Sequence, residues 1–283
     1  MELPFRPDHS GKVAVVTGGA GVLCREFCMA LAMCGAKVAV LNRTLARAEE
    51  VAENIRAAGG EATGFQVDAT DADSVKAAHE AVLATYGKCD ILINGAGGNH
   101  PDATADDEMF SMETLMADGK KSFFDLSGES FDKVFNLNIM GTLLPTQAFA
   151  RDMVENGHGC IMNISSMNAF TPLTKIPAYS AAKAGVSNFT EWLAVHFAKS
   201  GIRVNAIAPG FFSTAQNKKL LWNDDGTPTA RTGKIIAATP MGRFGVPEEL
   251  IGALLFLTDD KSAGFITGVV LPVDGGFNAY SGV

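Results

Sequence analysis

The stretch KVAVVTGGAGVLC, residues 12–24, decides the fold class of this chain. It begins with a short apolar, β-branched run and continues into a glycine-rich segment, after which the apolar residues take helical spacing. A strand, a glycine-rich turn and a helix in this order form the first unit of a doubly wound α/β sheet. Backbone N–H groups at such a helix start can hold a pyrophosphate, although a glycine-rich turn alone is as often only a tight connection.

Six further short apolar runs follow along the chain, separated by segments with helical spacing. Continuous apolar strands that alternate with helices predict a mostly parallel, seven-stranded Rossmann sheet with helices on both faces. The carboxyl ends of the strands then meet at one edge, where ligands bind at the point at which the strand order reverses. The six runs are KVAVLN at 37–42, ATGFQV at 62–67, DILIN at 90–94, CIMNIS at 160–165, IRVNAIA at 202–208 and GVVLPV at 268–273.

The composition is that of a folded, acidic protein. Of the 283 residues, 47% are hydrophobic and 19% are charged, which is enough apolar material for one sizeable core. The formal net charge is −8 and the acidic residues are spread along the chain, which argues against a nucleic acid or an anionic membrane as a partner. The five cysteines include no C-x-x-C pair, so we expect free thiols and neither a disulfide framework nor a metal site.

We expect one domain over residues 1–283, because no internal repeat and no linker rich in proline, glycine or serine divides the chain. Two long, polar, irregular stretches interrupt it, at about 98–130 and 214–239, and stretches of this length in compact domains are commonly functional. Both should follow strands at the ligand edge and cover a small polar substrate. The amino-terminal residues lack an apolar signal segment and no run approaches the ~20 apolar residues of a membrane helix, so the predicted location is the cytoplasm.

The segment SSMNAFTPLTKIPAYSAAK, residues 165–183, carries the clearest chemical signal. Tyr179 and Lys183 are spaced i and i+4, so they lie on one face of a helix. A tyrosine with a pKa of ~10 is a poor base near neutral pH, and a neighbouring ammonium group should favour its ionised form. Ser166, at the end of a predicted strand, can hydrogen-bond a reacting carbonyl oxygen. Taken singly, these features also fit a surface contact and a helix cap.

In this order and spacing, the residues resemble the short-chain dehydrogenase/reductase family. The resemblance extends from Lys12 to the closing GVVLPVDGGF. It implies an NAD(P)-dependent enzyme that interconverts a secondary alcohol and a ketone. In the family, an asparagine kinks a helix and relays protons towards the lysine, and Asn138 matches it better than Asn136; Ser166 fits the serine position better than Ser165. The implied catalytic residues are Asn138, Ser166, Tyr179 and Lys183.

The glycine-rich turn departs from the family pattern T-G-x-x-x-G-x-G. Thr17 and Gly18 match it, but Val22 and Cys24 occupy the second and third glycine positions, and Gly21 lies one place early. Side chains at these positions restrict how closely the backbone, a phosphate and the neighbouring strand can approach. A second departure lies at residues 94–97, NGAG, which resemble the family's NNAG turn with its second asparagine replaced by glycine.

The resemblance places a nicotinamide dinucleotide along the carboxyl ends of the strands. Asn42 and Arg43 stand where NAD-binding proteins usually carry an acidic residue, so Arg43 favours the 2′-phosphate of NADP, unless it only flanks a solvated helix start. Residues 209–214, PGFFST, match the family stretch that holds the nicotinamide carboxamide. The implied cofactor-binding residues are Gly18, Gly21, Val22, Leu23, Asn42, Arg43, Asp68, Ala69, Asn94, Ala96, Gly97, Tyr179, Lys183, Pro209, Gly210, Phe212 and Thr214.

Within the family, the chain is most similar to the D-mannonate oxidoreductase subgroup, which interconverts D-mannonate and D-fructuronate. The similarity rests on GAGGNHPDAT, NISSMNAFTPLTKIPAYSAAK and DGGFNAYSGV. A sugar acid needs a cation for its carboxylate and amides or hydroxyls for its polyol chain. Arg243 precedes an apparent helix start, so we expect it to form a structural pair. The candidate substrate residues are Asn99, His100, Met167, Asn168, Lys175 and Gln216, with Lys218 and Lys219 behind them.

Several alternatives stay open. A gluconate 5-dehydrogenase would need a closely similar site, whereas a 3-oxoacyl thioester reductase would need a basic rim for its carrier, which an acidic protein is less suited to offer. A nonenzymatic nucleotide-sensing module would have no need of all four catalytic groups. The family resemblance also implies a homotetramer, for which the apolar GALLFLT and GFITGVVLPV segments could supply one interface.

Overall fold

The computed structural model describes residues 7–214 and 221–282, and within these ranges seven parallel strands form one sheet. The strands are β1 (Val13–Thr17), β2 (Lys37–Asn42), β3 (Glu61–Gln66), β4 (Ile91–Asn94), β5 (Gly159–Ile164), β6 (Ile202–Pro209) and β7 (Val270–Val273). Their order across the sheet is β3-β2-β1-β4-β5-β6-β7, so the direction of winding reverses between β1 and β4. The predicted doubly wound α/β fold class is therefore confirmed.

The central strand β1 shows why the strands read as continuous apolar runs. Successive side chains of a strand point to opposite faces of the sheet. Ala14 and Val16 pack into one core cluster, while Val13 and Val15 pack into the other. All four residues are at most 3% exposed. Because both faces are covered, no polar alternation is left in the sequence.

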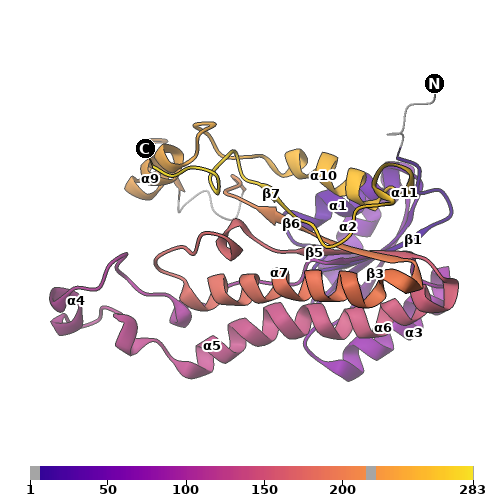
Figure 1. The fold of residues 1–283 in the computed structure, drawn as a ribbon, viewed down its shortest axis with the longest axis horizontal. Coiled ribbons are helices and arrows are strands. Elements are labelled where there is room, and N and C mark those ends of the chain that lie inside the picture. Colours follow the sequence, from indigo (N-terminus) through magenta and orange to yellow (C-terminus); the bar gives the residue numbers. More distant parts are fainter. Residues whose placement is uncertain (1–6, 215–220, 283) are drawn as a thin grey trace.

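Helices cover both faces of the sheet (Figure 1). The helices of the described residues are α1 (Cys24–Met33), α2 (Leu45–Ala57), α3 (Ala72–Tyr86), α4 (Met112–Met116), α5 (Gly128–Phe135), α6 (Gly141–Asn156), α7 (Pro177–Phe197), α9 (Ala230–Ala238), α10 (Ile251–Thr258) and α11 (Asp260–Ala263). α1, α2 and α10 pack on one face, and α3, α6 and α7 pack on the other. None of these helices has the length and apolar character that crossing a membrane would require.

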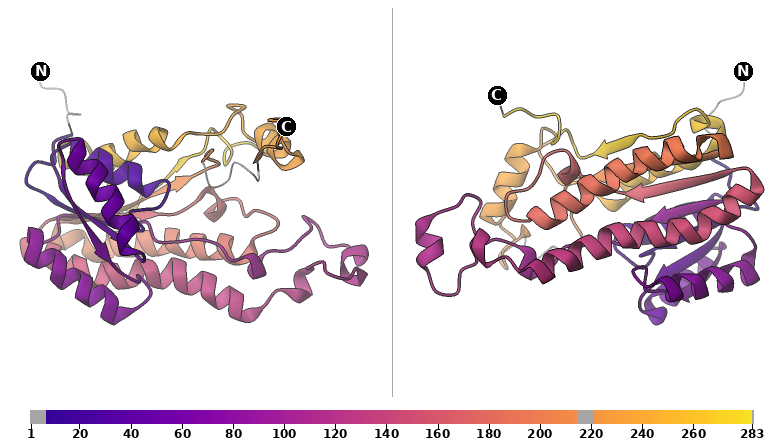
Figure 2. Two further views of the ribbon diagram at one scale, coloured as in Figure 1. Left: turned by 180° about the vertical axis from the view of Figure 1, so that it is seen from behind. Right: turned by 60° about the horizontal axis from the view of Figure 1, so that its bottom comes forward.

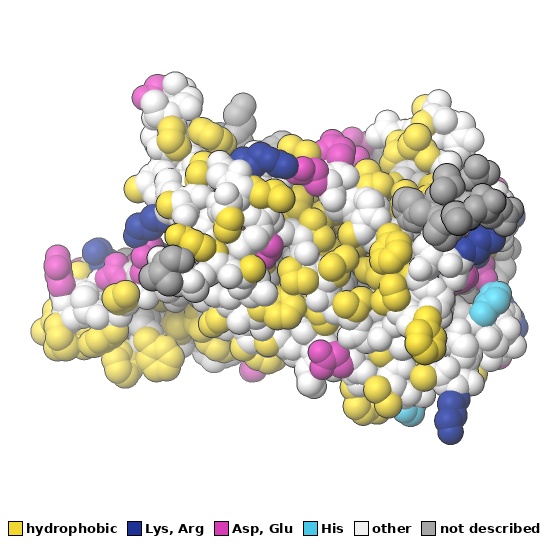
Figure 3. All heavy atoms as spheres, turned by 45° about the horizontal axis from the view of Figure 1, so that its top comes forward, with side chains coloured by type: hydrophobic (Ala, Val, Ile, Leu, Met, Phe, Trp, Pro, Cys, Tyr) yellow, Lys and Arg dark blue, Asp and Glu magenta, His cyan; other side chains and the backbone are white. Residues whose placement is uncertain are grey.

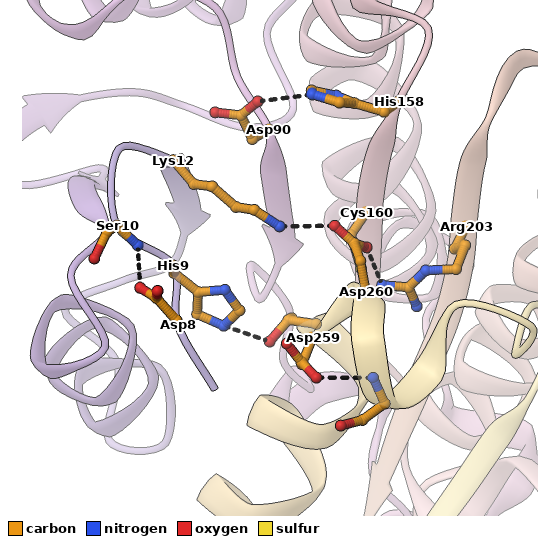
Figure 4. A network of polar contacts seen from close by, with 12 residues as sticks. Asp8, His9, Ser10, Lys12, Asp90, His158, Cys160, Arg203, Asp259 and Asp260 are labelled. Atoms are coloured by element: carbon orange, nitrogen blue, oxygen red, sulfur yellow. Dashed lines mark hydrogen bonds and ion pairs between the residues drawn. The ribbon is translucent and has the colours of Figure 1, made fainter. Parts of the chain in front are cut away.

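The amino-terminal edge of the sheet is held by charged groups (Figure 4). Lys12, just before β1, lies 2.7 Å from Asp260 of α11, and Arg203 of β6 lies 2.8 Å from the same carboxylate. Arg203 is 9% exposed and also donates a hydrogen bond to the carbonyl of Leu257. A buried guanidinium needs such partners, because an unpaired charge is costly away from water. These contacts lie at the opposite edge from the strand ends where ligands are expected.

The first irregular stretch forms an arm that projects from the body of the protein (Figure 2). It carries α4 between two short 3-10 turns, at Pro101–Ala103 and Phe123–Asp125. The arm is less polar than the sequence led us to expect, because hydrophobic side chains gather at its end (Figure 3). Its exposed large apolar residues are Met109, Phe110, Met112, Met116, Phe123 and Phe124.

The turn after β1 packs directly against the turn after β4. The hydroxyl of Thr17 accepts hydrogen bonds from the N–H groups of Gly95 and Ala96, at 3.1 and 3.2 Å. A Cβ at Gly95 would collide with the sulfur of Cys24 and would lie 2.7 Å from the carbonyl oxygen of Thr17. Cys24 thus occupies the space of a side chain at position 95. The two departures from the family pattern, cysteine for glycine at 24 and glycine for asparagine at 95, compensate for each other.

We predict that Gly95→Ala lowers the free energy of unfolding by about 1–3 kcal/mol, because the added methyl group has no room. Cys24→Gly in the same chain should recover part of this loss, since it removes the closest collision. Chemical denaturation of the wild type, both single variants and the double variant measures the coupling. Additive effects of the two substitutions would show that positions 24 and 95 do not compete for space.

Candidate functional site

A cavity of about 420 Å³ opens at the carboxyl ends of the central strands. Its volume lies within the range of small-molecule sites. It is bounded by the glycine-rich turn, the end of β5, α7, the segment after β6 and the second irregular stretch. Of the residues predicted from the sequence, it brings together Gly18, Gly21, Val22, Leu23, Gly97, Ser166, Tyr179, Lys183, Pro209, Gly210, Phe212 and Thr214.

Lys183 is a buried ammonium group at the floor of this cavity. It is 4% exposed, donates a hydrogen bond to the carbonyl oxygen of Ile164 at 2.7 Å, and lies 5.7 Å from the centre of the Tyr179 ring. Burial lowers the pKa of Lys183 to about 8, because the charged form loses its hydration. A lysine with this pKa can gain and lose a proton near neutral pH.

Tyr179 does not show the lowered pKa that a neighbouring ammonium group was expected to produce. Burial raises the pKa of the phenol above its ordinary value, and a hydrogen bond with Ser166 opposes this rise only in part. Lys183 lies over the face of the ring, and its hydrogen bond is directed to the backbone of β5. The expectation from charge attraction is therefore wrong for the chain by itself, where loss of hydration dominates.

The two neighbouring serines after β5 both line the cavity, but their hydroxyls have different hydrogen-bond partners. Ser166 lines the cavity and hydrogen-bonds Tyr179. Ser165 turns towards α7, where its hydroxyl lies 2.7 Å from that of Ser187 and donates to the carbonyl of Lys183. The arrangement fits the choice of Ser166, made from its spacing, as the residue that meets substrate.

Asn138 lies in a π-helical turn, Asn136–Met140, that joins α5 to α6. Such turns are common at functional sites. The side chain of Asn138 is fully buried and donates to the carbonyls of Val134 and Gly98, both at 2.8 Å. A Cβ at Gly97 would lie 2.8 Å from its oxygen and 3.0 Å from the nitrogen of Lys183. Asn138 and Lys183 therefore meet at a glycine, whereas Asn136 is exposed.

The glycine-rich turn presents free backbone donors at the start of α1. Within the described residues, no hydrogen bond is found for the backbone N–H groups of Val22, Leu23 and Cys24, and no side chain caps the helix. Unpaired N–H groups at a helix start bind phosphate, with help from the helix dipole. The turn can therefore hold the pyrophosphate of a dinucleotide in spite of Val22 and Cys24, since backbone rather than side chains supplies the donors.

The residues predicted at the adenosine end lie outside the cavity but on the same edge of the sheet. Arg43 is exposed at the end of β2, next to Asn42, whose amide donates to a backbone carbonyl at 3.2 Å. Asp68 follows the adjacent strand β3, and hydrogen bonds from Thr70 lower the pKa of its carboxyl, with a further contribution from Arg43. Ala69 is buried beside it.

The ends of β4 and β6 shape the remainder of the predicted cofactor site. Asn94 is 2% exposed and donates to Thr146 and Asn163, both at 2.9 Å, so its amide joins β4 to its neighbours. Ala96 is held through its N–H group by Thr17. After β6, Gly210 allows a close approach, because a Cβ there would lie 2.6 Å from the backbone of Asp274.

Three of the predicted substrate residues bond to the base of the arm. Among the described residues that line the cavity, none of the three is found. Lys175 in particular donates to a backbone carbonyl, so its charge serves to hold the arm. The contacts join Asn99 to Thr104, His100 to the N–H of Asp102, and Lys175 to the carbonyl of Asp106.

The other predicted substrate residues follow Ser166 or fall elsewhere. Met167 and Asn168 are buried in the 3-10 turn after β5, and the N–H of Asn168 donates to the hydroxyl of Ser166 at 3.3 Å. Their turn holds the hydroxyl of Ser166 in place through this hydrogen bond. Gln216 and the lysines at 218 and 219 lie outside the described residues.

The sequence did not indicate which part of the second irregular stretch faces the cavity. Arg231 and Ile235 of α9 line it, together with Leu221 and Phe244. The spacing of Arg231 and Ile235 at i and i+4 places them on one face of a helix. That spacing was the available signal, but a short helix in an irregular stretch gave no indication of which face meets the site.

Comparison with known proteins agrees with this geometry. A sequence model of the short chain dehydrogenase family matches residues 12–224. UxuB of Bacillus subtilis, an uncharacterized oxidoreductase, is 52% identical over 282 residues, which cover 99% of this chain and 100% of the relative.

Two solved structures are similar over nearly their whole length. A provisionally named D-mannonate oxidoreductase of Haemophilus influenzae, with bound NAD, has a TM-score of 0.94 and 51% identity, covering 98% of each chain. A gluconate 5-dehydrogenase of Burkholderia cenocepacia, in complex with NADP and tartrate, has a TM-score of 0.83 and 27% identity, covering 98% of this chain and 99% of the other. With the sheet, the glycine-rich turn and the side chains at the cavity, these matches show that the chain belongs to the short chain dehydrogenase family.

Proposed function

We propose that the protein interconverts a secondary alcohol and a ketone on a sugar acid, with D-mannonate and D-fructuronate as the leading pair. The observation that carries this proposal is the convergence of Ser166, Tyr179 and Lys183 at one cavity beside the glycine-rich turn. Family membership supports the oxidoreductase chemistry and argues against a nonenzymatic sensing module.

The three side chains divide the acid–base work of the reaction. When bound, the nicotinamide cofactor supplies or accepts the hydride. In the reductive direction, Ser166 donates a hydrogen bond to the ketone oxygen and holds it beside Tyr179. Because the pKa of Tyr179 is raised, the phenol is protonated at neutral pH and can give its proton to the developing alkoxide.

Lys183 supports this proton transfer by Tyr179. Its ammonium group lies over the Tyr179 ring, where it stabilises the negative charge that appears when the phenol gives up its proton. With a pKa of about 8, Lys183 can also release a proton to replace the one that Tyr179 has lost. Asn138 packs at Gly97 beside it and fixes the neighbouring backbone through Gly98.

Two similarities support a sugar acid as substrate. The structure that shares 51% identity carries the name D-mannonate oxidoreductase. The gluconate 5-dehydrogenase structure holds tartrate, a hydroxy acid with two carboxylates, and keeps a gluconate 5-dehydrogenase activity as the second candidate. A 3-oxoacyl thioester reductase fits less well, because the net charge of −8 does not favour an acidic carrier.

The two cofactors have different support. Arg43 favours the 2′-phosphate of NADP, since its exposed guanidinium group stands where an acidic residue would repel that group. The similar structure that shares 51% identity with this chain contains NAD. The proposal is therefore for an NAD(P) enzyme, and the comparison of the two cofactors is part of the test.

A homotetramer remains a prediction from the family resemblance. Apolar residues exposed on α7 and near the carboxyl terminus would be covered by such an assembly, as large apolar patches usually are. They include Trp192, Val195 and Phe265.

We predict that Tyr179→Phe reduces kcat at least about 1,000-fold, because the ring stays in place while the proton donor is lost. Binding of NADH or NADPH, followed by fluorescence titration, should change by less than about threefold. Tyr280→Phe is the matched control, since Tyr280 is exposed near the carboxyl terminus and should keep wild-type kinetics. Wild-type turnover by the Tyr179 variant would remove the acid–base role.

We also predict that the wild-type protein oxidises NADH or NADPH in the presence of D-fructuronate and reduces NAD or NADP in the presence of D-mannonate. A panel of sugar acids, their keto forms and 3-oxoacyl thioesters, followed by cofactor absorbance, checks this. Arg43 predicts a lower KM for NADPH than for NADH, and Arg43→Asp should reverse the order. Turnover of the thioesters with no sugar acid active would contradict the proposed substrate class.

A further inference from the structure

Arg231 is a charged residue of the cavity that the proposed chemistry does not use. It lies in the first turn of α9 and lines the same cavity as Tyr179 and Lys183. Of the described residues that line this cavity, Arg231 and Lys183 are the cationic ones, and none is aspartate or glutamate. A positively charged cavity in a protein with a net charge of −8 is suited to an anion.

Other cations around the cavity are already engaged. Lys234, one turn further along α9, pairs with Glu108 of the arm at 2.8 Å, and Arg243 pairs with Glu249 at 2.6 Å. Lys175 donates to a backbone carbonyl of the arm. Within residues 7–214 and 221–282, by contrast, no hydrogen bond or ion pair of the Arg231 side chain is found. The charge of Arg231 makes a small contribution to lowering the pKa of Glu108. The hydrogen-bond partner of Glu108, however, is Lys234.

The position of Arg231 is fixed by the packing of α9. Ile235, on the same helical face, packs with Leu221 and Phe244 in a small apolar cluster. Thr229 caps the helix by accepting a hydrogen bond from the N–H of Thr232. The helix is thus anchored beside the cavity, and its first turn brings the guanidinium group of Arg231 to the cavity that Tyr179 and Ser166 also line.

We propose that Arg231 binds the carboxylate of the substrate and sets the preference of the site for sugar acids over neutral sugars. This inference rests on the proposed function, because it assigns the substrate's carboxylate to a residue of the same site. A guanidinium group offers two parallel N–H donors that match a carboxylate, whereas a lysine offers only a point charge. The reacting carbon of the substrate lies at Ser166 and Tyr179, and its charged end is held by α9.

The test compares Arg231→Gln with the wild type on D-fructuronate and on D-fructose, which has the same ketone and no carboxylate. We expect the KM for D-fructuronate to rise about 10- to 100-fold, with kcat changed less than about threefold, because the lost interaction is a charge-assisted hydrogen-bond pair. Kinetics with D-fructose should be unchanged. Arg231→Lys should recover part of the loss.

Lys234→Gln is the matched control, since it removes the same charge from the same helix at a residue that is not among those lining the cavity. It should change the KM for D-fructuronate less than about threefold. An equal rise in the control, an equal loss on D-fructose, or an unchanged KM in Arg231→Gln would each overturn the assignment. A parallel rise in the dissociation constant of NADH or NADPH would overturn it too, by showing that Arg231 holds the cofactor.

A binding measurement separates this inference from the proposed function. If the wild type turns over no sugar acid in the panel, the proposed function fails, and calorimetric titration with tartrate in the presence of oxidised cofactor still tests Arg231. Binding by the wild type that is lost in Arg231→Gln supports an anion site on α9. Equal binding by both chains, or none by the wild type, overturns it.

Discussion

The burial of the Lys183 ammonium group is the constraint on which the rest of the site depends. It lies over the face of the Tyr179 ring, donates a hydrogen bond to a carbonyl of β5 and lies next to Gly97, where a side chain would collide with it and with Asn138. The folded chain binds this proton less tightly than the unfolded chain, because burial lowers the pKa from 10.5 to about 8. The fold is therefore less stable at neutral pH on account of this group, and regains stability as pH rises from about 8 to above 10. Such a group persists where function requires it.

The cofactor side of the cavity keeps its geometry although its sequence departs from the family pattern. Cys24 fills space that a side chain at position 95 would need, and Gly95 leaves that space open. The N–H groups at the start of α1 stay free, so phosphate binding does not require glycine at each family position. Counting glycines in the family pattern would suggest that this turn binds phosphate poorly. The packing shows instead that the cysteine at position 24 and the glycine at position 95 compensate for each other.

Local and short-range signals predicted most of the fold, and they singled out Ser166, Tyr179 and Lys183, which line one cavity in the structure. Each strand is a continuous apolar run because both faces of the sheet are covered, and the spacing of Tyr179 and Lys183 follows directly from a helix. The pKa of Tyr179 could not be predicted in this way, because it depends on how burial, Ser166 and Lys183 combine in space. Spacing alone suggested only the charge attraction.

The residues predicted to bind substrate come from segments without periodic patterns, and those within the described ranges are not among the residues that line the cavity. Lys175 lies between Ser166 and Tyr179 in sequence, yet its ammonium group donates to a backbone carbonyl of the arm. Arg231 lies fifty-two residues after Tyr179 in the chain, and the packing of α9 brings it to the same cavity. Contacts between such distant segments depend on tertiary packing, which a single sequence does not reveal.

Direct titration of the Lys183 ammonium group tests the central claim. NMR of protein labelled at its lysine side chains, with the Lys183→Met variant used to identify the signal, follows its protonation from pH 6 to 11. A midpoint near pH 8, well below the ~10.4 of an ordinary lysine, is the expected result. A midpoint above pH 10, shared with the surface lysines, would show that the ammonium group is not buried at the floor of the cavity and would contradict the account.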